Sequence, residues 1–74
     1  MRYNGRMKSI HQRIHHARER AGLTQAELAT ALSVQQPRVS RWERTERPRP
    51  QRLRQMAEVL AVSLPWLTTG EGKP

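Results

Sequence analysis

The sequence predicts an all-α domain in which five short helices pack around one small core. Apolar residues recur every three or four positions in successive stretches, and residues that favour helix starts or ends stand between those stretches. No stretch alternates apolar and polar residues as a half-buried strand would. With 74 residues the chain has room for one domain, and a domain of this size has a thin core.

The first helix is predicted over residues 10–21. Ser9 can cap its start, and Gly22 suits its end because glycine tolerates a left-handed backbone. The inward stripe, with spacings of four, three and four residues, is Ile10, Ile14, Ala17 and Ala21.

The second helix is predicted from Gln25 to about Leu32. Thr24 and Glu27 have the T-x-x-E spacing of a capping box, which marks its start. Its inward face comprises Leu28, Ala29 and Leu32. A very short connection, Ser33-Val34, follows.

A third helix is predicted over about residues 36–44. Gln35 stands at its cap position, and Pro37 falls in the first turn, where a missing N–H does no harm. Val39 and Trp42 are three residues apart and are expected to face the core. The remaining polar and cationic side chains then point outward.

The last third of the chain predicts a linker and two further helices. Pro50 ends the linker and opens a helix over about 50–61, with an inward face of Leu53, Met56, Ala57 and Leu60. A last helix, 64–69, follows Ser63 as its cap and ends at Gly70.

The expected domain organisation is simple. Residues 1–8 read as a flexible basic arm, residues 9–70 as the folded domain and residues 71–74 as a disordered tail.

The charge balance indicates a polyanionic partner. Lys and Arg number 14 against 6 Asp and Glu, a net charge of +8. Such an excess favours nucleic acid, and less often an acidic membrane surface; a basic but merely solvated surface is the alternative. No apolar run approaches the roughly 20 residues that span a bilayer, and no signal region follows the N-terminus. The protein is therefore expected in the cytoplasm, without a membrane partner.

Catalysis and metal binding find little support. The chain has no cysteine, which excludes disulfides and thiolate metal sites. His11, His15 and His16 lie close together, and His11 and His15 are four residues apart, but no third ligand is evident. Exposure or proximity to phosphate is the alternative. No Ser, Thr or Tyr has an obvious base partner, so we expect neither an enzyme, nor a cofactor, nor a small-molecule substrate.

The second helix, tight turn and third helix resemble the helix-turn-helix of the phage repressor and Cro-like family, also called the xenobiotic-response-element type. The resemblance covers roughly residues 10–71. Its markers are Gly22-Leu23-Thr24-Gln25, Leu28-Ala29, Val39, Trp42-Glu43, Leu60, Val62, Trp66-Leu67 and Gly70-Glu71. It implies a five-helix bundle of the lambda-repressor-like type.

That resemblance implies a sequence-specific regulator that binds double-stranded DNA. Helix 36–44 would enter the major groove, and a homodimer would bind an inverted-repeat operator on the nucleoid of a bacterial or phage-infected cell. The positions matching base contacts are Gln36, Pro37, Ser40 and Arg41. Those matching phosphate contacts are Gln25, Gln35, Arg38, Arg44, Arg47 and Arg49.

The resemblance also assigns supporting roles. Arg18 and Glu43 match an ion pair that holds the recognition helix, and Val39 and Trp42 brace it from behind. Leu64, Trp66 and Leu67 match a dimer contact, with plain core packing as the alternative. Where many members have a glycine after Trp-Glu, this chain has Arg44 and Thr45, and threonine is poor at positive φ. The resemblance therefore leaves the path of residues 45–49 open.

Two other classes remain as alternatives. One is the antitoxin half of a toxin–antitoxin pair, which binds both an operator and a toxin protein; an exposed apolar patch around Trp66 would favour it. The other is a non-specific binder of RNA or membranes. Its support is weak, because the only aromatic residues are Tyr3, Trp42 and Trp66 and the helices are weakly apolar.

Overall fold

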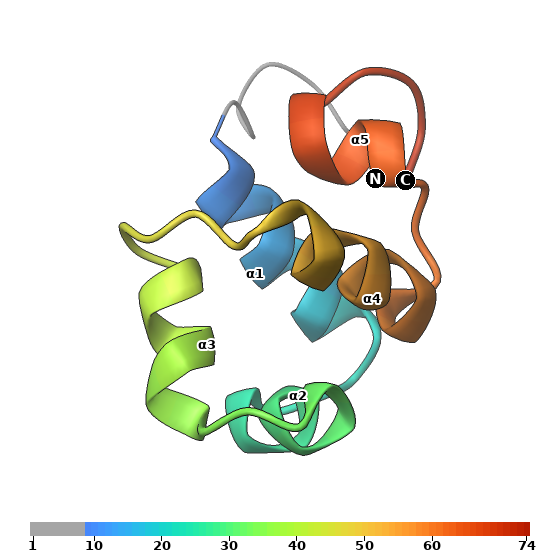
Figure 1. Ribbon diagram of the computed structural model, residues 1–74. Coiled ribbons are helices and arrows are strands. Elements are labelled where there is room, and N and C mark those ends of the chain that lie inside the picture. Colours follow the sequence, from blue (N-terminus) through green and yellow to red (C-terminus); the bar gives the residue numbers. More distant parts are fainter. Residues whose placement is uncertain (1–8) are drawn as a thin grey trace.

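The computed structural model describes residues 9–74 and contains only α-helices in that range. The helices are α1 (Ile10–Arg20), α2 (Gln25–Leu32), α3 (Gln36–Trp42), α4 (Pro50–Leu60) and α5 (Leu64–Thr69). α2 packs against α3 and α4, whereas α5 packs against α1 and α4 (Figure 1). This arrangement confirms the predicted all-α bundle; the arm predicted over residues 1–8 lies outside the described residues.

The predicted helix starts are confirmed where a side chain caps them. Ser9 Oγ accepts a hydrogen bond from the amide of Gln12 at 3.1 Å, and Ser63 Oγ accepts one from Trp66 at 3.2 Å. Thr24 and Glu27 form the capping box in both directions, at 3.0 and 2.8 Å. Each bond pairs a backbone amide that the helix itself leaves without an acceptor.

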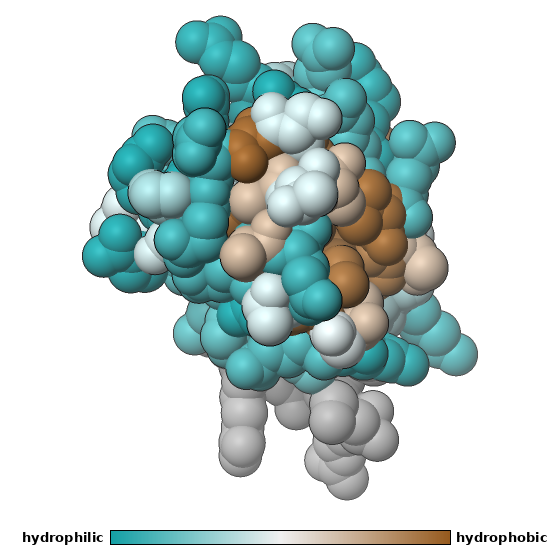
Figure 2. Space-filling model, turned by 90° about the horizontal axis from the view of Figure 1, so that it is seen from below, coloured by the Kyte–Doolittle hydropathy of each residue, from teal (hydrophilic) through white to brown (hydrophobic). Residues whose placement is uncertain are grey.

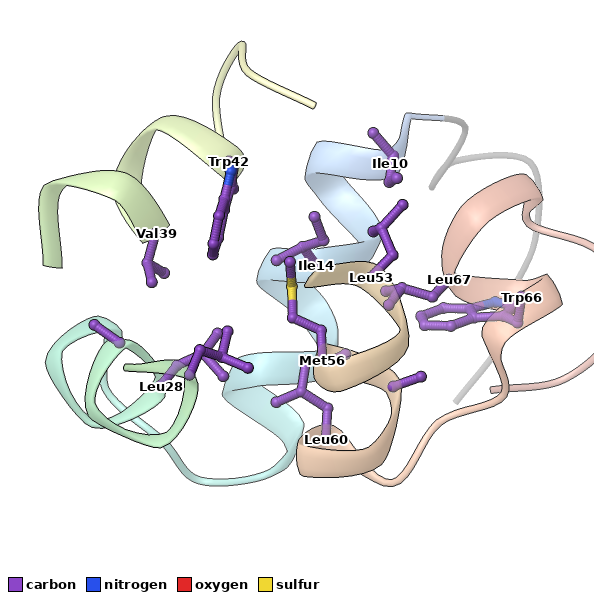
Figure 3. Packing of buried hydrophobic residues seen from close by; sticks show 14 residues of the cluster. Ile10, Ile14, Leu28, Val39, Trp42, Leu53, Met56, Leu60, Trp66 and Leu67 are labelled. Carbon is purple, nitrogen blue, oxygen red and sulfur yellow. The ribbon is translucent and has the colours of Figure 1, made fainter. Parts of the chain in front are cut away.

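One hydrophobic core joins all five helices. Figure 3 shows Val39 and Trp42 projecting from α3 into the interior, towards Ile14 of α1 and Met56 of α4. Trp66 of α5 closes the core at the end remote from α3. Of the residues predicted to face inward, Ala21 is exposed, because α1 ends one residue earlier and the chain turns at Gly22.

α3 is shorter than predicted. α3 ends at Trp42, not at residue 44, because the amides of Arg44, Thr45 and Glu46 all donate to the carbonyl of Arg41, at 3.1, 2.9 and 2.9 Å. Thr45 is thereby not among the residues with a positive φ, the conformation to which it is poorly suited. The turn carries the chain back to the core, where Pro48 is buried.

Two non-glycine residues end helices in the left-handed conformation. Ser33 ends α2 with φ +58°, and Ala61 ends α4 with φ +56°. In each turn the following amide reaches back along the helix: Val34 donates to the Ala29 carbonyl at 2.9 Å. The turn at Ser33 determines the direction in which α3 leaves α2. The sequence has no glycine there that would have indicated a left-handed turn.

Beyond α5, residues 71–74 contain no helix or strand, and Ser63 Oγ donates to the Lys73 carbonyl at 3.0 Å. Their predicted disorder stays a prediction. In residues 9–74 no helix is long and apolar enough to cross a bilayer. Figure 2 shows brown and pale surface gathered over α2 and the C-terminal end of α4, while the side that carries α3 is largely hydrophilic.

Candidate nucleic-acid interface

α3 lies at the edge of the molecule (Figure 1). One of its faces is buried in the core and the other is exposed to solvent. Val39 and Trp42 are 0% and 1% exposed, so the helix is held firmly from behind. Gln36, Pro37 and Arg41 are exposed on the outer face, and Ser40 is half-buried. An α-helix fits the major groove of B-form DNA, and amide, hydroxyl and guanidinium groups are the donors and acceptors that read base edges there.

The ion pair implied by the resemblance is present at the end of α3. Arg18 donates to both carboxylate oxygens of Glu43, from Nε at 2.6 Å and from Nη2 at 3.1 Å. The Glu43 side chain is 4% exposed and that of Arg18 11%. Arg18 also donates to the Leu23 carbonyl at 2.8 Å, so one guanidinium ties α1 both to the start of the helix-turn-helix and to its end.

Both members of this pair are held in their charged forms. Burial would raise the pKa of Glu43, but hydrogen bonds from Arg18, His15 and Gln25 outweigh it and leave the pKa below the ordinary value. The hydrogen bond to Glu43 raises the pKa of Arg18 against the opposing effect of burial. A charged, hydrogen-bonded pair of this kind fixes the angle of α3 relative to α1.

Two glutamines extend this network onto the outer face of α3. Gln36 Nε2 donates to Gln25 Oε1 at 2.7 Å, and Gln25 Nε2 donates to Glu43 Oε1 at 3.2 Å. Gln25 was predicted only as a phosphate contact, and the sequence held no signal for its link to Gln36. The link orients the first outward side chain of α3 from within the protein.

The exposed arginines near α3 have loose internal contacts. The Arg38 guanidinium lies 5.8 Å from the ring centre of Trp42, and Arg44 Nε donates to the Ser40 carbonyl at 3.2 Å. Arg41 Nε lies 3.8 Å from a Glu46 carboxylate oxygen, with both side chains about half exposed. The other predicted phosphate-contacting residues, all exposed beside α3 or in the linker after it, are Gln35, Arg47 and Arg49.

Some of the basic charge has a structural role that the sequence analysis missed. Arg13 is 3% exposed and donates to the α5 carbonyls of Leu67 and Thr68, at 3.0 Å each. Burial lowers its pKa, and the charge of Arg47 adds to this effect. Arg52 similarly donates to the Leu32 carbonyl at the end of α2, at 2.8 Å. Arg13 lies three residues after Ile10 on the inward stripe, which is the signal that could have found it.

The predicted dimer residues lie mostly inside the molecule. Trp66 and Leu67 are 2% and 0% exposed, so neither side chain is available at the surface of the single chain. Leu64 is half-buried and packs against the edge of the core. Core packing, the alternative interpretation of this group, accounts for the positions of Trp66 and Leu67.

The histidines of α1 contact protein groups. His11 Nδ1 lies 2.8 Å from the Trp42 carbonyl oxygen, and His15 Nδ1 lies 2.8 Å from Glu43 Oε1. Within residues 9–74, no three His, Cys, Asp or Glu side chains gather as a metal site would require. Both imidazoles instead touch the C-terminal end of α3.

The fold and this braced helix define a helix-turn-helix protein. A helix-turn-helix family model matches residues 14–67, and the chain belongs to this family, in its phage repressor-like form.

Three similar proteins illustrate the relationship. The chain is 36% identical over 67 residues to the HTH-type transcriptional regulator for conjugative element SXT of Vibrio cholerae, covering 90% of this chain and 31% of that one. It is 38% identical over 68 residues to the repressor protein CI of Enterobacteria phage phi80, covering 92% and 29%. Among solved structures, the P22 c2 repressor in complex with a synthetic operator superposes with a TM-score of 0.78 at 27% identity, covering 84% of this chain and 96% of that one. The chain thus spans about a third of the length of the curated relatives it matches.

Proposed function

We propose that this chain is the DNA-binding module of a repressor- or Cro-like transcriptional regulator, with α3 lying in the major groove of double-stranded DNA. One observation carries the proposal: the outer face of α3 presents amide and guanidinium groups, while Val39, Trp42 and Glu43 fix the helix from behind. The regulators named above and the operator-bound neighbour support it. The mechanism is occupancy of a DNA site, not catalysis.

The proposed base contacts follow from side-chain chemistry. Gln36 pairs with adenine through N6 and N7, and Arg41 with guanine through O6 and N7. Pro37 offers only apolar contact, for instance to a thymine methyl group, and Ser40 offers a hydroxyl. The groups proposed to contact phosphates are those of Gln25, Gln35, Arg38, Arg44, Arg47 and Arg49.

We further propose that two copies bind an inverted repeat inside the cell, with half-sites about one helical turn apart. Of the three candidate dimer residues, Leu64 is partly accessible, so it is the one proposed to touch a second copy. Trp66 and Leu67 would contribute by holding α5 in place. The antitoxin alternative is not favoured, because the apolar patch that it needs around Trp66 is replaced by a buried indole.

Selection of binding sites from random duplex DNA tests the proposal. We expect enrichment of one inverted repeat, whose spacing gives the distance between the two recognition helices. Sequences without any shared pattern at moderate ionic strength would overturn sequence-specific binding. Enrichment of a single half-site without symmetry would overturn the dimer alone.

Arg41→Ala tests the role of the recognition helix. We expect the variant to lose preference at one position of each half-site, weakening binding to the preferred base by about 1–3 kcal/mol. Competition binding against single-base operator variants measures this. Arg54→Ala, which removes an exposed arginine of α4, serves as the control. Uniformly weaker binding with an unchanged base preference would show that Arg41 touches only phosphate.

A further inference from the structure

His15 lies between two carboxylates, one on its own helix and one at the end of α3. Its Nδ1 is 2.8 Å from Glu43 Oε1, and its Nε2 is 3.2 Å from Glu19 Oε1. The imidazole is 47% exposed, Glu43 is 4% exposed and Glu19 is 61% exposed. The ring therefore joins a buried acceptor to a solvated one.

Only a protonated ring satisfies both contacts. A neutral imidazole has one N–H and one lone pair, so either tautomer points a lone pair at a carboxylate oxygen. The imidazolium donates from both nitrogens, and its bonds to carboxylates are roughly twice as strong as neutral ones. Nδ1 faces the buried carboxylate of Glu43, so only a proton on Nδ1 can form a hydrogen bond to that carboxylate.

The charged and titratable groups around His15 come from α1 and from the end of α3. Arg18 Nη2 lies 3.1 Å from His15 Nδ1, but it also donates to Glu43 Oε1, so both donors share one acceptor oxygen. α2 contributes the uncharged Gln25, and His16 and Arg44 line the same open cleft, which has a volume of 580 Å³. The two carboxylates favour a proton on the ring, whereas the positive charge of Arg18 opposes it.

Glu43 Oε1, the oxygen that His15 contacts, is also linked to a side chain on the outer face of α3. Glu43 Oε1 accepts from Gln25, and Gln25 in turn accepts from Gln36. Two hydrogen bonds therefore connect Glu43 Oε1 to Gln36, the first side chain proposed to read a base. Through them, the charge of His15 can affect the position of Gln36.

We propose that His15 is a positioning residue. In its protonated form it hydrogen-bonds to Glu43 and helps to hold α3 in place, a contact called the brace below. DNA affinity therefore falls as the imidazole becomes neutral on raising the pH. The inference rests on the proposed function, but the brace itself exists without DNA. Histidine is the side chain that changes charge between about pH 5 and 8. A half-exposed ion pair corresponds to a change of about two- to fivefold in affinity across that range.

The first experiment uses the free protein. Imidazole ¹⁵N spectra between pH 5.5 and 8 should show both His15 nitrogens protonated at the acidic end and Nδ1 still protonated at the basic end. Amide-exchange protection of α3, relative to α4, should decline over the same range in the wild type and in His16→Gln, but not in His15→Gln. A proton that stays on Nε2 instead, or α3 protection indifferent to His15, would overturn the brace.

The second experiment measures dissociation constants for the selected operator at constant ionic strength. The wild type and His16→Gln should weaken about two- to fivefold more than His15→Gln between pH 5.5 and 8. His15→Lys, which keeps its charge, should retain its affinity up to pH 8. Equal pH dependence in the wild type and His15→Gln would overturn the proposal.

Salt dependence separates this role from a direct phosphate contact. A brace acts within the protein, so His15→Gln should leave the slope of log affinity against log salt unchanged at pH 5.5. A slope reduced by about 0.9 would instead show that His15 binds a phosphate and would overturn the positioning role. If no duplex is preferred at all, the proposed function fails, while the spectra of the free protein still decide whether the brace exists.

Discussion

At the scale of single residues, Glu43 links the end of α3 to two other helices. Its carboxylate accepts hydrogen bonds from α1 through Arg18 and His15, and from α2 through Gln25. The same residue caps the C-terminal end of α3. Removing its charge therefore affects both the stability of the fold and the position of the helix.

We predict that Glu43→Gln lowers the free energy of unfolding by about 3 kcal/mol, because it leaves the largely buried Arg18 without its counter-charge. Chemical denaturation at neutral pH measures this. Glu58→Gln, on the exposed face of α4, should change stability by less than about 0.5 kcal/mol. An equal loss of stability in the two variants would show that the Arg18–Glu43 ion pair stabilises the fold no more than an exposed charge does.

The same residue predicts acid sensitivity. Because the pKa of Glu43 is lower in the folded protein than in the unfolded chain, its contribution is complete above the unfolded-state pKa and is lost as the pH falls through the folded-state pKa. Unfolding measured as a function of pH should therefore show a shallower acid loss in Glu43→Gln than in the wild type. Parallel curves would contradict this sign.

At the scale of elements, α5 is held by a side chain that lies far away in the sequence. Arg13 donates to two carbonyls in the last turn of α5, where the helix provides no donors of its own. The guanidinium also approaches Gly70, the left-handed residue that ends α5. α5 is only six residues long, so its stability comes from this contact and from core packing.

We predict that Arg13→Met destabilises the fold by about 2–3 kcal/mol, since hydrogen bonds from a charged donor are lost and buried carbonyls are left unpaired. Thermal denaturation measures the loss, and faster amide exchange in α5 than in α2 would locate it. Arg54→Met, on the exposed surface of α4, is the matched control. A stability equal to that of the control would mean that solvent replaces the guanidinium without cost.

The turn after α4 offers an opposite, stabilising change. Ala61 has φ +56°, a conformation that costs an L-residue about 1–2 kcal/mol and costs glycine little. We therefore expect Ala61→Gly to raise the free energy of unfolding by about 0.5–1 kcal/mol, after subtraction of the greater entropy of the unfolded chain. Ala31→Gly, in the right-handed backbone of α2, should lower it by about 1 kcal/mol. Destabilisation by both variants would contradict the left-handed turn.

At the scale of the whole molecule, the arginines behind the net charge of +8 include two groups with different roles. Arg13, Arg18 and Arg52 hold helices together through carbonyls or Glu43. The arginines proposed for phosphates are exposed, and they lie on α3 and in the linker that follows it. A basic composition thus overstates the number of cations available to a polyanion.

The four arginines proposed for phosphates, Arg38, Arg44, Arg47 and Arg49, set the expected salt dependence. Counterion release predicts a slope of log affinity against log salt of roughly −3.6 per subunit and about −7 for a dimer. Binding isotherms at several salt concentrations measure it. Arg47→Ala should reduce the slope by about 0.9 per subunit, and Arg54→Ala should leave it unchanged. A flat salt response would argue against phosphate contacts.

The sequence by itself determined the number, order and starts of the helices and most of the core. These features depend on caps and apolar spacings that involve residues within four positions of one another, so they are visible along the chain. The family markers placed the Arg18–Glu43 pair as well.

Only the tertiary structure decided where α3 ends, which arginines are structural, and what surrounds Glu43. The His15–Glu43 contact joins residues 28 positions apart, and the Arg13–Leu67 contact joins residues 54 apart. Likewise, Trp66 and Leu67 are core residues because α5 folds back onto α1 and α4. Contacts of this kind form only when distant helices pack, and neither periodicity nor capping encodes which side chains then meet.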